Sequence, residues 1–141
     1  MQRILVPVDG SPSSNHAVDH VIAQKKSGAD VEVHLLHAQP SLLPSDVPNI
    51  AKPGLAERLA FDDADHAFAT AKQHLEDSGV NYTTRTELGD PPSAIALYAD
   101  VHGCDEIVMG TRGLGPLKNL LMGSVAMKVL HVVKVPVTLV K

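Results

Sequence analysis

The sequence predicts an α/β fold in which a parallel sheet is covered by helices on both faces, and three observations support this class. Apolar runs rich in β-branched residues alternate along the chain with segments of helical spacing. Several of these runs are apolar at nearly every position, as in strands that are buried on both faces. Most connections between the elements are short. This order implies right-handed crossovers and a doubly wound parallel sheet.

Five apolar runs are expected to form the strands. The first, fourth and fifth are almost continuous, whereas the third is weaker. They span residues 4–8, 31–36, 80–88, 107–109 and 135–140.

Between the strands, four segments carry apolar residues at helical spacing. The four stripes are Ala17, Val18, Val21 and Ile22; Ala56, Ala60, Ala64, Ala67, Phe68, Ala71 and Leu75; Ile95, Tyr98 and Ala99; and Val125, Val129, Val132 and Val133. Ser11-Pro12 and Asp90-Pro91 each indicate an N-cap followed by proline in the first helical turn. The glycines at positions 28, 79 and 103 are placed to end three of these helices.

Length and composition limit the classes of protein. A chain of 141 residues suits one domain over 1–141 with a core of its own. The single cysteine, Cys104, makes no internal disulfide and fits a reducing compartment. No apolar run approaches the roughly 20 residues of a membrane span. A soluble cytoplasmic protein is expected.

The formal net charge is −4 and aromatic residues make up 3% of the chain, with no Trp. Both values argue against nonspecific binding to nucleic acid or to anionic lipid. The charge is unevenly distributed, because the stretch 110–141 contains five Lys or Arg and no Asp or Glu.

That acid-free stretch opens with a glycine-rich segment after the fourth predicted strand. Gly110, Gly113 and Gly115 allow positive φ angles and a close backbone approach, so that successive N–H groups can face one anion. Gly123-Ser124 then begins a helix, whose N-terminal N–H groups favour phosphate. Ligands of open α/β sheets bind beyond the carboxyl ends of the strands, where Asp9 also lies.

Two common phosphate motifs do not fit this segment. A Walker A loop requires Gly-Lys-Ser/Thr where Gly115 is followed by Pro116 and Leu117, and a dinucleotide fingerprint requires glycine where Lys118 stands. A tight turn plus a helix cap is the structural alternative. Three glycines, an arginine and a helix start in one crossover favour an anion site.

The spacing Gly110-x2-Gly113-x9-Gly123-Ser124 resembles the G-x2-G-x9-G-[S/T] signature of the nucleotide-binding universal stress proteins. Segments along the chain support the resemblance: residues 4–11, Leu36-His37-Ala38, Gly89-Asp90-Pro91 and Val135-Pro136-Val137. The resemblance implies a flavodoxin-like three-layer sandwich with strand order 3-2-1-4-5, ATP as ligand with Mg²⁺, and a homodimer.

Carried over position by position, the resemblance also implies the site. Pro7 and Asp9 would border the adenosine, with the Asp9 carboxylate at the ribose hydroxyls, and the backbone of Ala38 would read the adenine edge. The remaining positions are Met109 and Gly110, which would line the pocket, and Gly113, Gly123, Ser124 and Val125, which would hold the phosphates. Arg112 lies at a variable position of the signature, suited either to assist a phosphate or to face solvent.

Several of these residues have a purely structural alternative. Asp9 can cap the turn into the first helix. Ser124 can cap the fourth helix, which does not conflict with phosphate binding. His37 lies beside the proposed adenine contact, and a packed strand histidine is the favoured interpretation. His16 and His20 share a helix face, but no third ligand indicates a metal site.

Three functions are compatible with these features. The leading one is an ATP-binding regulatory or stress-response module without catalytic residues. A weak ATPase is the enzyme alternative, for which Asp9 is the only carboxylate near the phosphates. A phosphoacceptor domain of the receiver type would use Asp9 and Thr111. However, this sequence lacks the paired acids and the Lys-Pro turn of that class.

Two further expectations concern the surface. The proline-rich connection 39–54 is either a lid or a surface excursion without a role. The last strand, residues 135–140, is apolar with no helix after it to cover its edge, which predicts a homodimer joined through these strands.

Overall fold

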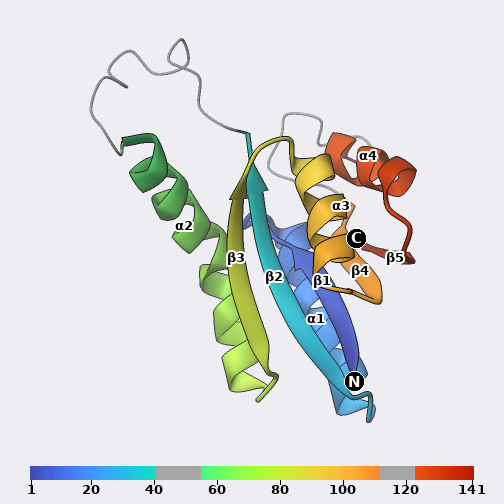
Figure 1. The fold of residues 1–141 in the computed structure, drawn as a ribbon. Helices are drawn as coiled ribbons and strands as arrows, with labels where there is room; N and C mark the ends of the chain where they lie inside the picture. Colours follow the sequence, from blue (N-terminus) through green and yellow to red (C-terminus); the bar gives the residue numbers. More distant parts are fainter. Residues whose placement is uncertain (41–54, 112–122) are drawn as a thin grey trace.

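The computed structural model describes residues 1–40, 55–111 and 123–141, and for 55–63 it describes the backbone alone. Strands and helices alternate from β1 to β5 in these residues (Figure 1). The strands are β1 (Gln2–Pro7), β2 (Val31–Gln39), β3 (Tyr82–Leu88), β4 (Glu106–Gly110) and β5 (Val137–Val140). The helices are α1 (Pro12–Lys26), α2 (Leu55–Asp77), α3 (Pro91–Val101) and α4 (Ser124–Val132).

The five strands form one sheet in the order β3-β2-β1-β4-β5, and all neighbours are parallel. The register runs from Gln2 opposite Val31 to Pro7 opposite Leu36 in the β1–β2 pair. The α/β class and the strand order 3-2-1-4-5 are confirmed. All carboxyl ends of the strands therefore lie at one edge of the sheet.

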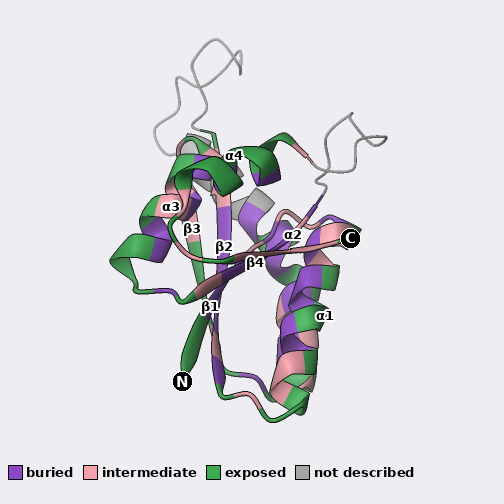
Figure 2. Ribbon diagram, turned by 90° about the vertical axis from the view of Figure 1, so that its right-hand side faces the viewer, coloured by how far each residue is buried: buried purple, intermediate pink, exposed green. Residues whose placement is uncertain are grey.

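Each face of the sheet is covered by two helices, which makes the three layers. One core contains Ile4, Val6 and Val108 from the sheet and packs under α1 and α2. The other contains Leu5 and Ile107 and packs under α3 and α4. Burial is concentrated along β1, β2 and β4 and on the inner side of α1 (Figure 2).

The predicted helix signals are in place. Ser11 caps α1 by accepting from the Ser14 N–H, and Asp90 caps α3 by accepting from the Ser93 N–H. Both helices carry proline in the first turn. Three exit glycines, at positions 28, 79 and 103, have positive φ.

The stripe predicted for the fourth helix is only partly right. Val129 is buried, but Val125 and Val132 are 36% and 51% exposed, and the second buried residue is Ala126. A nine-residue helix has little more than two turns, and α4 lies on the sheet with a different face from the one its valines suggest. Among the described helices, none is long and apolar enough to span a membrane.

Candidate functional site

The described residues of the predicted site gather at the carboxyl edge of the sheet. Pro7 ends β1, Gly110 ends β4, and Ala38 lies one residue before the end of β2. Gly123 directly precedes α4. The fold thus brings together positions that are up to 116 residues apart in sequence, because parallel strands all end on the same side.

Asp9 has the structural role considered for it, and its contact with ribose stays a prediction. Its Oδ1 accepts a hydrogen bond from the Ser11 N–H at 2.9 Å, so the carboxylate closes the turn into α1. Its own N–H donates to Ser14 Oγ at 3.4 Å. Among the described residues Oδ2 has no hydrogen-bond partner, and Asp9 is only half-buried. One oxygen therefore holds the loop, and the other is available to a ligand.

Gly110 must be glycine for steric reasons, and not because of a positive φ angle as predicted. Its φ is not positive, so the left-handed conformation is not used at this position. A Cβ here would lie 2.5 Å from Ser13 Oγ and 2.7 and 2.8 Å from the carbonyl carbon and oxygen of Ser13. The backbone of Gly110 therefore lies close to the first turn of α1, and its predicted approach to an anion stays a prediction.

The start of α4 differs from the cap proposed for Ser124. The N-cap is Gly123, with φ −73° and ψ 164°, and no side-chain capping hydrogen bond is formed within the described residues. Ser124 is the first helical residue and is exposed, as is Val125. The interpretation of Ser124 as the cap is therefore wrong. In the part of the chain that the structure describes, the N-terminal amides of α4 thus have no side-chain acceptor of the kind that such helices commonly have.

Thr111 links β4, β5 and α4. Its N–H donates to the Val140 carbonyl at 2.9 Å, and its carbonyl accepts from the Gly123 N–H. The side chain is 6% exposed, and within the described residues its Oγ1 has no hydrogen-bond partner. A buried hydroxyl without a partner loses its hydrogen bonds to water and gains none within the protein in exchange. Sequence reasoning considered Thr111 only as a receiver residue and missed this position.

Two other predicted residues have clear structural surroundings. Met109 is 5% exposed and packs in the core beneath α3 and α4. Ala38 is half-buried in β2, opposite Glu87 of β3. Arg112 and Gly113, with Gly115 and most of the 39–54 connection, lie outside the described residues.

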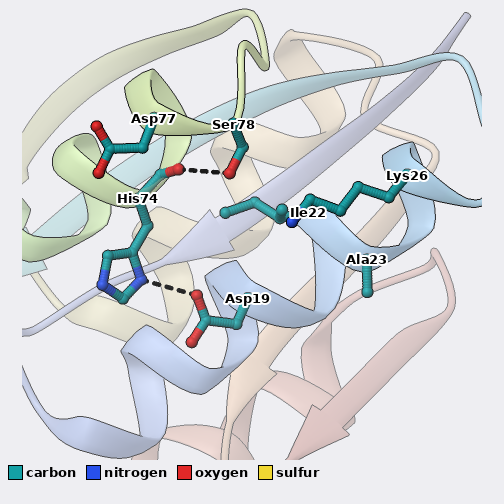
Figure 3. A pocket seen from close by; sticks show the side chains of 7 residues that line it. All are labelled: Asp19, Ile22, Ala23, Lys26, His74, Asp77 and Ser78. Carbon is teal, nitrogen blue, oxygen red and sulfur yellow. Dashed lines mark hydrogen bonds and ion pairs between the residues drawn. The ribbon is translucent and has the colours of Figure 1, made fainter.

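A groove of about 420 Å³ lies elsewhere, between α1 and α2 (Figure 3). Asp19 and His74 face each other across it, with Nδ1 2.7 Å from Oδ1, and Ser78 donates to the His74 carbonyl. None of the predicted site residues lines this groove. In the described part of the chain no three His, Cys, Asp or Glu side chains form a possible metal site.

A second polar cluster, which is partly buried, lies under α3. His34 contacts the Tyr98 hydroxyl through Nδ1 and Glu32 through Nε2, both at 2.9 Å, and Tyr98 stacks on His102. Burial raises the pKa of the nearby Cys104 thiol to about 11, so this cysteine stays protonated near neutral pH. These groups stabilise the core.

The family model described as the universal stress protein family matches residues 1–141. The chain belongs to the universal stress protein family. Universal stress protein MJ0531 of Methanocaldococcus jannaschii is 31% identical over 140 residues, covering 99% of this chain and 82% of the relative. The receiver interpretation, which shares the fold class, is not supported by this match.

Solved structures agree with the assignment. The structure of MJ0577, from the same organism, is 31% identical and has a TM-score of 0.79 over 99% of this chain and 95% of its own. A universal stress protein in complex with cAMP is 26% identical, with a TM-score of 0.60 over 99% and 95% of the two chains. Some members of this fold thus bind adenine nucleotides.

Proposed function

We propose that this universal stress protein binds ATP at the carboxyl edge of its sheet and acts as a nucleotide-dependent regulatory module in the stress response. The observation that carries the proposal is the convergence of Asp9, Ala38, Gly110 and Gly123 at that edge. The N-terminus of α4, which no described side chain caps, offers N–H groups and a positive dipole end to phosphate. The related cAMP complex supports an adenine nucleotide as ligand.

The proposed contacts follow the geometry. Asp9 Oδ2 accepts from the ribose hydroxyls while Oδ1 keeps the turn closed. Pro7 and Met109 border the nucleoside, and the Ala38 backbone meets the adenine edge. Gly113, Gly123, Ser124 and Val125 hold the phosphates. Arg112 supports them, as does the Thr111 hydroxyl, which has no hydrogen-bond partner within the described residues.

Mg²⁺ fits this site only as part of the nucleotide complex. Mg²⁺ is commonly held by phosphate oxygens, waters and one or two carboxylates. Asp9 is the one carboxylate among the proposed contacts, and one of its two oxygens already accepts a hydrogen bond from Ser11. This arrangement suits binding better than hydrolysis, which needs a group to position the attacking water. We therefore propose that the protein binds the nucleotide rather than hydrolysing it.

The bound nucleotide is testable directly. Freshly purified protein, denatured and analysed by mass spectrometry, is expected to release ATP, and nucleotide-depleted protein is expected to bind Mg-ATP in calorimetry. Protein that releases no nucleotide and gives no heat with millimolar Mg-ATP would overturn the proposal. Inorganic phosphate at the same concentration serves as the control for nonspecific anion binding.

The exposed edge of β5 supports a homodimer joined through residues 135–140. Among the described strands β5 pairs with β4 alone, and all four of its residues are half-buried. The Pro136 and Val140 carbonyls bond to β4, so the N–H of Val137 points away from that strand. An unpaired backbone edge is a template for a second strand.

Light scattering at micromolar concentration is expected to give about twice the chain mass of 15.0 kDa. Val137→Pro removes one outward N–H and is expected to give a monomer with unchanged circular dichroism, because proline is tolerated on an edge strand. Thr138→Ser, which keeps a hydroxyl for its bond to Glu106, is the matched control that remains dimeric. A monomeric wild type excludes this interface.

A further inference from the structure

The buried His37 makes a hydrogen bond that interrupts the sheet at the proposed site. His37 is 8% exposed on β2, and its Nδ1 lies 2.9 Å from the carbonyl oxygen of Val8. Since a carbonyl can only accept, Nδ1 carries the proton and donates. The side-chain oxygen Oε1 of Gln39 lies 3.0 Å from Nε2, and Phe68 of α2 packs edge-on against the ring. The ring is thus held from three sides.

The Val8 carbonyl would otherwise belong to the sheet. β1 and β2 pair up to Pro7 opposite Leu36, and the Val8 N–H still donates to the Leu36 carbonyl at 2.8 Å. In a parallel ladder the next bond runs from the Ala38 N–H to the Val8 carbonyl. This bond is missing from the described backbone contacts, and the imidazole of His37 takes its place.

The missing bond affects the backbone groups of Ala38. The Gln39 carbonyl accepts from the Gly89 N–H beside β3, so the backbone groups of Ala38, one residue earlier, point to the β1 side. There the ladder has ended, and Ala38 presents an N–H and a C=O side by side. Adenine offers the complementary pair, a ring-nitrogen acceptor next to an amino donor.

We infer that His37 is a positioning residue for nucleotide recognition: by drawing the Val8 carbonyl out of the ladder, it leaves the Ala38 amide free to read the adenine edge. This inference rests on the proposed function, since it assigns a cause to the adenine contact of that site. The sequence-based interpretation of His37 as a packed strand residue is confirmed by its 8% exposure, and the ring has a specific donor role in addition.

The first test needs no nucleotide. In nucleotide-depleted wild type, the Ala38 amide is expected to exchange with solvent quickly compared with its neighbours in β2, and to become protected on addition of ATP. In His37→Phe, which keeps the ring against Phe68 but has no donor, the amide is expected to be protected without ligand as the ladder closes. A protected Ala38 amide in the free wild type overturns the inference whether or not ATP binds.

The second test measures selectivity. Compared with ATP, inosine triphosphate exchanges the donor and the acceptor on the Watson–Crick edge of the base, and its ribose and phosphates are the same. The wild type is expected to prefer ATP, and His37→Phe is expected to lose about tenfold in ATP affinity, with the two nucleotides bound nearly equally. His37→Asn places an amide donor near the position of Nδ1 and is expected to keep the preference within about threefold.

The outcomes separate the two proposals. A wild type that binds no nucleotide contradicts the proposed function, and the exchange measurement still decides the role of His37. A wild type that binds ATP, with a His37→Phe variant that keeps the full ATP preference, overturns this inference alone. His37→Leu replaces the Phe variant if that variant does not fold.

Discussion

Gly110→Ala is expected to lower the free energy of unfolding by about 2–3 kcal/mol, because a Cβ at this position would meet the backbone of Ser13. The carbonyl carbon and oxygen of Ser13 cannot move aside without moving α1. For a domain of this size the loss corresponds to a fall in Tm of roughly 6–10 °C. Chemical denaturation with a two-state fit measures the free energy, and a thermal scan measures the Tm.

Gly28→Ala is the matched control for this substitution. Gly28 has φ +100°, but a Cβ there would meet nothing within 4 Å. It therefore tests backbone conformation without steric overlap, and a loss of about 1 kcal/mol is expected. Gly110→Ala with the stability of the wild type would contradict the argument, since it would mean that α1 and β4 separate at no cost.

Gly113→Val is expected to abolish ATP binding, by at least about 100-fold, while the fold persists. A branched side chain at this position of the signature prevents the close approach of backbone N–H groups to phosphate oxygens. Calorimetry with Mg-ATP measures the affinity, and circular dichroism with thermal melting verifies the fold. The two glycines are thus expected to separate stability from binding, with Gly110 supporting the fold and Gly113 the ligand.

Leu114→Val is the control in the same segment. It introduces the same β-branched side chain one residue later, at a variable position of the signature, and is expected to keep the ATP affinity within about threefold. Unchanged binding by Gly113→Val would show that Gly113 is only a turn residue. The phosphate contacts of the proposed function would then have to be reassigned.

Much of the fold could be predicted because its signals are local. The nearly continuous apolar runs gave the strands, and Ser11-Pro12 and Asp90-Pro91 mark the starts of α1 and α3, where caps and prolines act within one turn. The fourth helix was less predictable. Its valines suggest one face, yet Val125 and Val132 are exposed and Ala126 is buried. Which side of a short apolar helix is covered depends on its neighbours.

The candidate site, like the fold, could be predicted from the sequence only in part. The glycine signature and Asp9 could be recognised in the sequence, and with them the expectation of a phosphate ligand. The interactions of Asp9 with Ser11 are local, and a cap was anticipated. The contact of Gly110 with Ser13 joins positions almost 100 residues apart, and no pattern within either segment indicates it.

The sequence by itself determined the fold class, the family and the order of the elements, because these follow from periodicity, capping residues and a spaced motif. Only the tertiary structure decided what individual residues do. His37 is one more polar residue in an apolar strand until β1 and β2 are placed side by side, and then its ring is found on the Val8 carbonyl. Such roles depend on which backbone groups remain unpaired where two strands diverge, and that is set by packing across the sheet.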